Sequence, residues 1–406
     1  MTPLFQNRDF VRLWTAALLS NYGSMLRGVA LPLLAVLVLD AEPRHMAWLG
    51  VATLLPGFAF GLLAAPWVDR RRRLPLLVSA DVARALLLAA VGIGTWQGWI
   101  GLPGLYVAAF ALGSFHFLFG VANAAFLPSL VPREQLLAAN SRIKAAEAVT
   151  EGAGFASAGW LVQWLGAPFA LLVDALSFLV SAVLLRGIRA PEPAPPPAKP
   201  GAGLQLGAGL RTIAESDVLR ALVGAAWLRA FGHQVVGVVY MLYVTRALGF
   251  APGLLGMVFA VGAVSSFGGA LLAERAGRRI GPGPTMAAGL GVAGLAIGLL
   301  PFAPPASWLG VALLIAHQLG DGADVLYDVN ERSVRQRIVA GDRLGRVTGA
   351  LRFGELGAML LASALGAWVA ETFGLRAALG LGACGVTLGG LAIALSRAGR
   401  LRATGA

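Results

Sequence analysis

The chain consists of long apolar segments that follow one another with only short polar breaks. Of its 406 residues, 57% are hydrophobic and 13% are charged, and the mean hydropathy is +0.75. Lipid cannot hydrogen-bond to the backbone, so segments of this kind cross a membrane as helices of ~20 residues or as closed barrels. Barrel strands are shorter and alternate in polarity, and these segments do not alternate. The sequence therefore predicts an all-α polytopic membrane protein.

Twelve segments have the length and composition of a membrane span. The predicted spans cover residues 13–38, 46–67, 75–97, 103–129, 140–164, 168–187, 218–244, 253–273, 283–303, 307–331, 347–370 and 375–396. The single cysteine, Cys384, lies in the last of them. One cysteine provides neither a disulfide framework nor a thiolate metal site.

Basic residues gather on one side of these spans. That side holds Arg8, Arg12, Arg70 to Arg73, Arg133, Arg186, Arg189, Lys199, Arg275, Arg278, Arg279, Arg335, Arg337, Arg343, Arg346, Arg397, Arg400 and Arg402. The other side holds only Arg44, Arg246 and Arg376. The positive-inside rule then places both termini on the cytoplasmic side of the inner (cytoplasmic) membrane. It also explains the isoelectric point of about 11.1, so no nucleic-acid partner is expected.

A proline-rich stretch divides the chain near its middle. Six prolines fall within residues 191–200, which favours an extended, semi-rigid linker. A shift of 208 positions aligns DFVR (9–12) with DVLR (217–220). The same shift aligns a longer block without gaps: Lys144 with Arg352, Glu147 with Glu355, Trp160 with Trp368, and Gly166 with Gly374. We predict an N-terminal six-helix bundle (1–187), a cytoplasmic linker (188–212) and a C-terminal six-helix bundle (213–406).

Two loop segments carry a further repeat, GLLAAPWVDRRRR (61–73) and GALLAERAGRR (269–279). Together with FLPSLVPREQLLAANS (126–141) and DALSFL (174–179), they resemble the major facilitator superfamily over the whole chain, and within it the bacterial branch of macrolide-efflux and siderophore-export proteins. The first copy departs from the family pattern, because Arg72 stands where glycine is usual and Pro66 and Trp67 precede the acid. The resemblance implies the major facilitator fold, in which twelve transmembrane helices form two pseudo-symmetric bundles.

The resemblance also implies a conformational switch at these loops. An acid near a helix end accepts hydrogen bonds from helix N-termini and from arginine. Asp69 is expected to hold the two halves together through Arg346 and Arg352, and Glu274 to face Arg142 or Lys144. The switch candidates are Asp69, Arg70, Arg73, Glu274, Arg275, Arg346, Arg352 and Glu355. A plain cluster of positive-inside residues is the alternative interpretation.

The stretch HQLGDGADVLYDVNER (317–332) places an acidic stripe on one helix. His317, Asp321, Asp324, Asp328 and Glu331 share a helical face. The predicted helix has no basic residue before Arg332, so we expect several of these acids to face water, a proton or a cation. Glu331 is expected at a wet cytoplasmic mouth. The alternative is a shorter span, from which residues 324–331 emerge into the cytoplasm.

Other polar residues interrupt the apolar helices, namely Arg27, Glu147, Glu151, Asp174, Arg229 and His233. The two arginines keep their charge and are natural counter-ions for carboxylates. Glu147 and Glu151 are expected either to face a central cavity or to form buried ion pairs. Asp174 needs a partner or a proton, and His233 is either a proton carrier or a hydrogen-bonded core residue.

Asp81 and Arg84 lie three residues apart early in the third predicted span. Side chains at this spacing meet on one helical face. We interpret them as a structural pair rather than as part of a transport site.

These features predict a secondary transporter rather than an enzyme, since the chain has no ATP-binding phosphate loop, no HExxH motif and no nucleophile elbow. No cofactor or resident metal is expected. We expect a monomer that exports amphipathic, cationic organic molecules across the lipid bilayer in exchange for protons, by alternating access. The alternatives are an exporter of an anionic metabolite or siderophore bound by Arg27 and Arg229, a divalent-metal carrier that uses His317, Asp321 and Asp324, and a non-transporting scaffold or sensor.

The predicted topology can be tested with two single cysteines in a Cys384→Ser background. A cysteine at position 99 should react with a membrane-impermeant thiol reagent in intact cells. A cysteine at position 198 should react only after the membrane has been opened. Labelling of both positions from the same face would contradict the arrangement of twelve spans.

Overall fold

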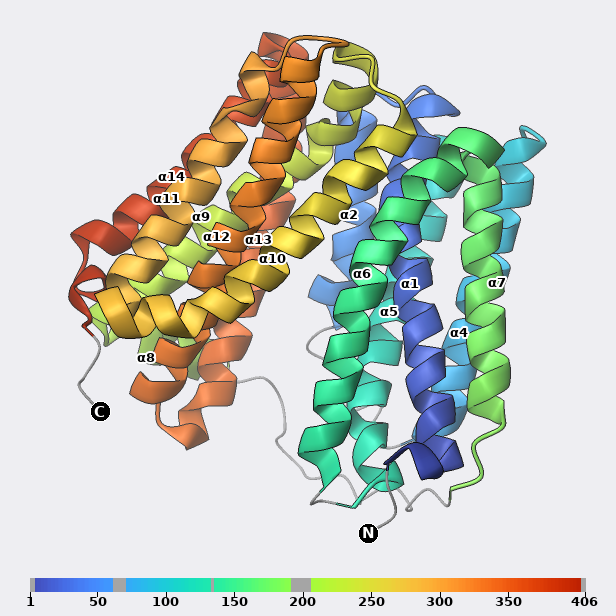
Figure 1. Ribbon diagram of the computed structural model, residues 1–406, viewed down its shortest axis with the longest axis horizontal. Coiled ribbons are helices and arrows are strands. Elements are labelled where there is room, and N and C mark those ends of the chain that lie inside the picture. The colour runs from blue at the N-terminus through green and yellow to red at the C-terminus, as the bar shows by residue number, and fades with distance from the viewer. Residues whose placement is uncertain (1–3, 61–70, 133–134, 191–205, 403–406) are drawn as a thin grey trace. The chain divides into compact units, whose positions relative to one another are not determined.

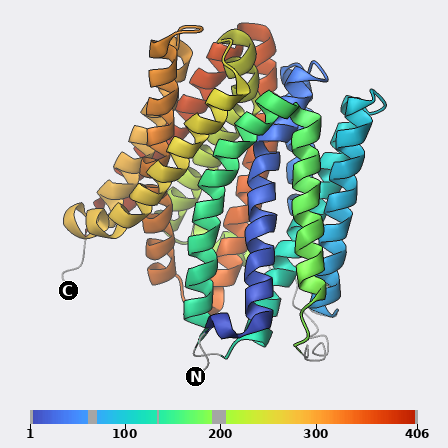
Figure 2. The same ribbon diagram turned by 45° about the vertical axis from the view of Figure 1, so that its right-hand side comes forward.

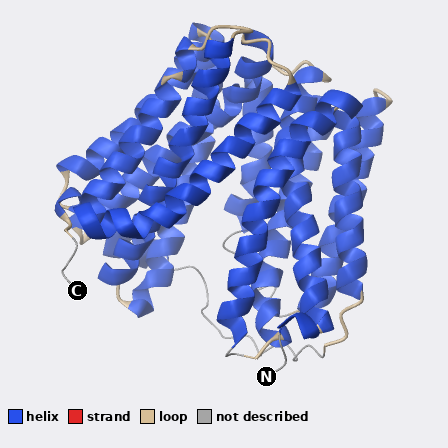
Figure 3. Ribbon diagram, in the orientation of Figure 1, coloured by secondary structure: helices blue, strands red, loops and turns tan. Residues whose placement is uncertain are grey.

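Helices make up the regular structure of the computed structural model, which describes residues 4–60, 71–132, 135–190 and 206–402 (Figure 1). Figure 3 shows no strand among these residues. Twelve of the described helices are 17 residues or longer, and they overlap the twelve predicted spans. The all-α polytopic fold is therefore confirmed. Residues 61–67 of the second predicted span lie outside the described residues.

The chain divides into two units by its internal contacts. Unit 1 comprises Met1–Ala41, Val51–Gly203 and Pro252–Ala260. It contains α1 (Arg8–Leu37), the second part of α2 (Pro43–Phe60), α4 (Arg73–Trp96), α5 (Leu102–Leu130), α6 (Leu136–Leu165) and α7 (Ala167–Arg186). The first turns of α10 also belong to this unit.

Unit 2 comprises Glu42–Gly50, Leu204–Ala251 and Val261–Ala406. It contains α8 (Leu206–Ala214), α9 (Asp217–Leu242), most of α10 (Pro252–Ile280), α11 (Pro282–Gly298), α12 (Trp308–Ile338), α13 (Gly341–Phe373) and α14 (Leu375–Leu395). A π-helical turn, Tyr243–Ala247, continues α9.

The same helix pairings occur in both units, as the sequence repeat predicts. In unit 1, α1 packs on α6 and α7, and α4 packs on α5 and α7 (Figure 2). In unit 2, α9 packs on α13 and α14, and α11 packs on α12 and α14. Two aligned glycines mark equivalent corners: Gly166 (φ 86°) joins α6 to α7, and Gly374 (φ 90°) joins α13 to α14. Side chains disfavour this left-handed region, which explains glycine at both corners.

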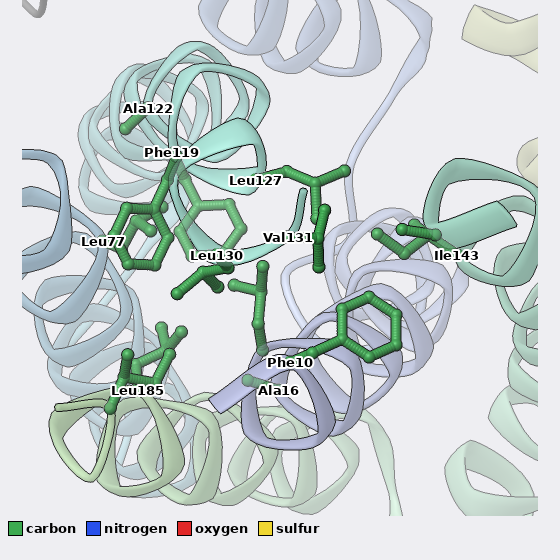
Figure 4. Packing of buried hydrophobic residues seen from close by; sticks show 14 of the residues in the cluster. Phe10, Ala16, Leu77, Phe119, Ala122, Leu127, Leu130, Val131, Ile143 and Leu185 are labelled. Atoms are coloured by element: carbon green, nitrogen blue, oxygen red, sulfur yellow. The ribbon is translucent and has the colours of Figure 1, made fainter. Parts of the chain in front are cut away.

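The apolar core of unit 1 joins one end of α1, α4, α5, α6 and α7. Phe10 of α1, Leu77 of α4 and Leu185 of α7 are fully buried in this cluster (Figure 4). Phe126 of α5 is fully buried in it as well. Because the cluster is formed by residues at the start of α1 and the end of α7, it closes the unit at the end where the arginines gather.

Nine helical segments in the described part of the chain are long and apolar enough, by length and composition alone, to cross a membrane. The long helices α1, α2 and α6 fall outside this group. In α6 the reason is visible in the sequence, because Arg142, Lys144, Glu147 and Glu151 fall within its first sixteen residues. Polar positions of this kind face protein or water rather than lipid.

The predicted linker 188–212 is not extended throughout. Its last residues form the beginning of α8, which packs on α13. A Cβ atom at Gly209 would lie 2.3 Å from the carbonyl oxygen of Arg346, so glycine allows the two helix backbones to touch. Ile213 is buried on the same side. The apolar face of this short segment explains why it folds onto the bundle.

A charged pair lies at the centre of unit 1. The Arg84 guanidinium donates to Asp81, and the two side chains are 1% and 0% exposed. Ser181 donates to Asp81 Oδ2 at 2.6 Å. The guanidinium also lies 4.3 Å from the ring centres of both Phe119 and Phe178. The structural interpretation of this pair agrees with these contacts.

Breaking this pair on one side should be far more damaging than removing both charges. Arg84→Leu leaves the Asp81 charge buried without its partner, which costs about 3–5 kcal/mol of stability. The double variant Asp81→Leu/Arg84→Leu should be more stable than Arg84→Leu. Midpoints of thermal unfolding in detergent measure both, and a double variant less stable than the single one would contradict the assignment.

Candidate functional site

A cavity of about 350 Å³ lies within unit 2. Its walls come from α9, α10, α12 and α13, and its lining residues are Arg229, Ala230, His233, Ser266, Asp321, Asp324, Val325, Arg352, Glu355 and Met359. Two arginines, three carboxylates and a histidine thus meet in a bundle that is otherwise apolar. Such a concentration of ionisable groups within membrane spans marks a functional site.

Asp324 is held in the cavity by the side chains of two residues. Arg229 grips it with two hydrogen bonds, one from Nε to Oδ1 at 2.7 Å and one from Nη2 to Oδ2. The imidazole Nε2 of His233 lies 3.2 Å from Oδ1. The Asp324 side chain is 10% exposed and that of His233 is 36% exposed. A buried carboxylate held by a bidentate guanidinium is strongly oriented, while His233 keeps part of its ring open to the cavity.

The geometry follows from two helical faces. Arg229 and His233 lie four residues apart on α9, so both side chains point toward the same neighbour. The neighbour is α12, whose N-terminus is capped by the Ser307 hydroxyl, which accepts from the backbone N–H of Gly310 at 3.0 Å. Tyr327, one turn beyond Asp324, is buried, and its ring centre lies 5.6 Å from the Arg229 guanidinium. The ring stabilises the guanidinium through a cation–π contact.

The second arginine of the cavity also has a carboxylate partner. Arg352 donates to Glu355 at 3.0 Å across one turn of α13. Its side chain is 62% exposed and that of Glu355 is 11% exposed. The aligned residues of the other unit form the same kind of pair, with 2.6 Å between Lys144 and Glu147. Arg352 and Glu355, predicted as switch residues, thus line the cavity as well.

Asp321 is the third carboxylate of the cavity and lies one turn before Asp324 on α12. It packs against α10 where that helix has no side chain: a Cβ atom at Gly262 would lie 2.6 Å from Asp321 Oδ2. Any larger residue there would have to displace the carboxylate. The structure thus brings Asp321, Asp324, Arg229 and His233 to one cavity, and Arg229 lies beside a carboxylate as its fixed charge led us to expect.

The lower part of the stripe differs from the sequence prediction. Asp328 pairs with Arg332 at 2.8 Å, and Glu331 pairs with Arg335 at 2.8 Å, both along α12. Glu331 is 4% exposed and Arg335 is 8% exposed, so the expectation of a wet mouth at Glu331 is wrong. The helix continues without a break to Ile338. Arg332 and Arg335 lie just beyond the apolar run, and each neutralises the acid four residues before it.

His317 contacts a different part of α9 from Asp324. It is 8% exposed, and its ring centre lies 5.7 Å from that of Tyr240 on α9. It is not among the residues that line the cavity. Within the described residues no three His, Cys, Asp or Glu side chains are grouped as metal ligands. The convergence of His317 with Asp321 and Asp324 that a metal carrier needs is therefore not observed.

The predicted site residues of unit 1 form separate contacts. Arg27 Nη1 lies 3.7 Å from Asp174 Oδ2, and the Asp174 side chain is fully buried. Asp174 also accepts from the Ser177 hydroxyl at 3.3 Å. Glu147 pairs with Lys144, but the two side chains are 36% and 78% exposed, so the expected buried ion pair is wrong. Glu151 is exposed on α6. Arg27 thus pairs with a carboxylate of its own unit.

The loop residues are described only in part. Asp69 and Arg70 lie outside the described residues. Glu274 pairs with Arg278 at 3.3 Å on α10, and both side chains are about three-quarters exposed (76% and 74%). Arg275 is exposed, whereas Arg73 and Arg346 are half-buried.

Comparison with known proteins identifies the family. A family profile described as Major Facilitator Superfamily matches residues 13–323. The chain belongs to the major facilitator superfamily. It is a polytopic membrane transporter, not an enzyme.

Individual relatives agree with this assignment. An uncharacterized MFS-type transporter of Sinorhizobium fredii, y4rN, is 27% identical over 337 residues, which are 82% of this transporter and 81% of the relative. Among solved structures, a bacterial homologue of the iron transporter ferroportin has a TM-score of 0.77 at 18% identity, over 95% of this chain and 98% of that one. The nucleoside transporter NupG has a TM-score of 0.72 at 14% identity, with the same two coverages. At these identities the structures establish a shared fold alone.

Several residues that line or support the cavity cannot be recognised from a local sequence pattern. Ser266 of α10 and Met359 of α13 line the cavity, and Tyr327 supports Arg229. Serine, methionine and tyrosine are ordinary residues in apolar helices, so only the packing of α10 and α13 against α12 reveals them. Tyr327 alone carried a signal, because it lies three residues after Asp324 on the same face.

The two arginine pairs of the cavity should differ in strength. A double-mutant cycle with Arg229→Gln and Asp324→Asn should give a coupling of about 1.5–3 kcal/mol, as for a charged, buried hydrogen-bonded pair. The same cycle with Arg352→Gln and Glu355→Gln should give no more than about 1 kcal/mol, because Arg352 is largely exposed. Thermal unfolding in detergent measures both cycles. Equal couplings would show that Asp324 is not held as described.

Proposed function

We propose that the protein is a proton-driven exporter of amphipathic organic cations, which works by alternating access with the unit 2 cavity as its binding site. The observation that carries the proposal is the pairing within that cavity: both arginines are engaged by carboxylates, Asp324 and Glu355. A third carboxylate, Asp321, lines the same space. Three acids against two arginines favour a positively charged cargo.

The excess of acid also supports exchange with protons. With His233 neutral and all three carboxylates ionised, the cavity walls carry more negative than positive charge, and a cation restores the balance. A proton bound by Asp321, or by His233, restores the same balance without cargo. Cation and proton therefore compete, and competition of this kind is the basis of antiport. His233 keeps its ring partly open beside Asp324, where it can receive a proton from water.

The apolar part of the cargo fits the remainder of the wall. Ala230, Val325 and Met359 line the cavity beside the charged groups. Methionine is flexible and polarizable and adapts to ligands of different shape. An amphipathic cation would place its charge near Asp321 and its apolar surface on these three residues.

The same pairings weigh against the other candidate functions. An anionic cargo needs arginine, yet Arg229 is held by Asp324 and Arg27 faces Asp174. An anion would have to displace a carboxylate from one of them. A scaffold or sensor has no need of a cavity with ionisable walls. The resemblance of the loop segments to macrolide-efflux and siderophore-export proteins supports export as the direction.

The location, topology and residue roles that complete the proposal follow from the sequence. The transporter would lie in the cytoplasmic membrane as a monomer, with both termini and the linker 188–212 in the cytoplasm. Its halves, 1–187 and 213–406, would alternate about the bound cargo. Asp69, Arg70, Arg73, Glu274, Arg275 and Arg346 would control closure on the cytoplasmic side. Asp174 with Arg27, and Glu147 with Glu151, would be further proton-coupling groups in the N-terminal half.

Binding of tetraphenylphosphonium to the purified transporter tests the proposal. Binding should weaken as the pH falls from about 8 to 5, because protons neutralise the acids that hold the cation. Asp321→Asn should weaken binding by ~1–3 kcal/mol, the usual contribution of a charged contact, and should flatten the pH dependence. Asp324→Asn should also weaken binding, because it leaves Arg229 with an uncompensated positive charge. In vesicles, a proton gradient should drive export of a fluorescent cation by the unmodified protein.

Asp328→Asn is the matched control, since Asp328 lies on the same helix, pairs with Arg332 and does not line the cavity. It should leave cation binding within about twofold of the unmodified protein. Unchanged affinity and pH profile in both Asp321→Asn and Asp324→Asn would contradict the proposal. Tighter binding of an organic anion than of the cation would favour the anion exporter instead.

A further inference from the structure

The two units carry the same three charged residues near the ends of their first and last helices. Asp9, Arg12 and Arg189 in unit 1 align with Asp217, Arg220 and Arg397 in unit 2, each at the shift of 208 positions that relates the two halves. The first two of each set form the repeated D-x-x-R motif that opens α1 and α9. The third lies just after α7 or α14. The site in the cavity makes no use of any of them.

In unit 1 these residues tie the exit of α7 to the start of α1. Asp9 Oδ1 accepts from Arg12 at 3.1 Å, and Asp9 Oδ2 accepts from the backbone N–H of Arg189 at 3.2 Å. Arg12 also donates to the carbonyl oxygen of Gly187, the C-cap residue of α7. Ile188, between the two contacts, is buried in the apolar core. The Asp9 carboxylate thus binds a backbone N–H, and the Arg12 guanidinium a backbone carbonyl, of the segment that follows α7.

In unit 2 the same carboxylate makes an equivalent connection with different atoms. Asp217 accepts from Arg220 on α9, and its second oxygen lies 2.8 Å from the guanidinium of Arg397. The following segment continues the attachment: Ala398 is fully buried, and the carbonyl oxygen of Leu401 accepts from the backbone N–H of Gly283 at 3.2 Å. The C-terminal segment is therefore fastened to both α9 and α11.

We propose that each set of three residues is a clasp that holds the last helix of a unit to its first helix, so that the two helices move as one piece during transport. The first helices carry functional side chains: α9 holds Arg229, twelve residues or ~18 Å along the helix from Asp217. A helix that is fixed at this end keeps its register against α14. The Arg229 side chain then stays oriented toward Asp324. Asp9, Arg12, Asp217 and Arg397 are positioning residues in this account.

The two clasps should differ in strength. The Asp9 and Arg12 side chains are 20% and 36% exposed, whereas Asp217 and Arg397 are 42% and 77% exposed. Exposed ion pairs contribute little because water and salt screen them. Arg12 also satisfies a helix C-terminal carbonyl, which would otherwise lose its partner. Loss of the unit 1 clasp should therefore have the larger effect.

Hydrogen exchange measured by mass spectrometry tests the clasps without any cargo. In Asp9→Ala the backbone amide of Arg189 should exchange about tenfold faster, because its acceptor is gone. In Arg397→Gln the amide of Gly283 should exchange about twofold to threefold faster. Arg8→Gln and Arg400→Gln are matched controls: each removes an exposed arginine next to a clasp, and neither should change these rates.

Transport gives the second readout. Initial rates of cation export should fall several-fold in Asp9→Ala and about twofold in Arg397→Gln, with the affinity for the cation unchanged within twofold. The exchange rates decide the proposal even if the cargo is not a cation, so the clasp and the proposed function can fail separately. Arg397→Gln removes an exposed side chain and keeps the test valid if Asp9→Ala does not fold. Unaltered exchange at Arg189 and Gly283, or equal effects in the two controls, would overturn the clasp.

Discussion

The charge of Asp324 within an apolar helix is the constraint on which the candidate site depends. An ionised carboxylate inside a membrane span is costly unless the protein surrounds it with partners. The protein provides Arg229, His233 and the ring of Tyr327 beneath the guanidinium. These partners come from two helices, so one ionic contact fixes how α9 and α12 face each other. The cavity lies beside this contact, and Arg229 and Asp324 form part of its wall.

The two units use the same helix pairings for different purposes. Unit 1 places its main charged pair, Asp81 and Arg84, among hydroxyls and aromatic rings where both side chains are 1% exposed or less. Unit 2 places its pair beside an open cavity and adds a histidine. The repeated fold thus supplies a closed charge pair in one unit and an accessible one in the other. This asymmetry is the physical reason why we propose the binding site in unit 2.

The sequence was sufficient for the fold because membrane spans are determined by local composition. Twelve apolar segments became twelve long helices, and aligned glycines such as Gly166 and Gly374 became equivalent corners. Helical spacing placed Asp321 and Asp324 on one face of a helix, and the fixed charge of Arg229 made it an expected counter-ion for carboxylates of this kind. The sequence prediction failed for Glu331, since the partner of that acid, Arg335, lies beyond the apolar run and folds back by one turn. Residues such as Ser266 and Met359 could not be found, because the packing of separate helices, not any local pattern, brings them to the cavity.

The most direct test of the account is the number of protons released when a cation binds. In weakly buffered detergent solution near pH 7, addition of tetraphenylphosphonium to the purified transporter should release close to one proton for each cation bound, because the two compete for the same negative charge. Asp321→Asn should bind the cation weakly and release almost none. Saturating cation binding without proton release by the unmodified protein would contradict exchange between cation and proton at this cavity.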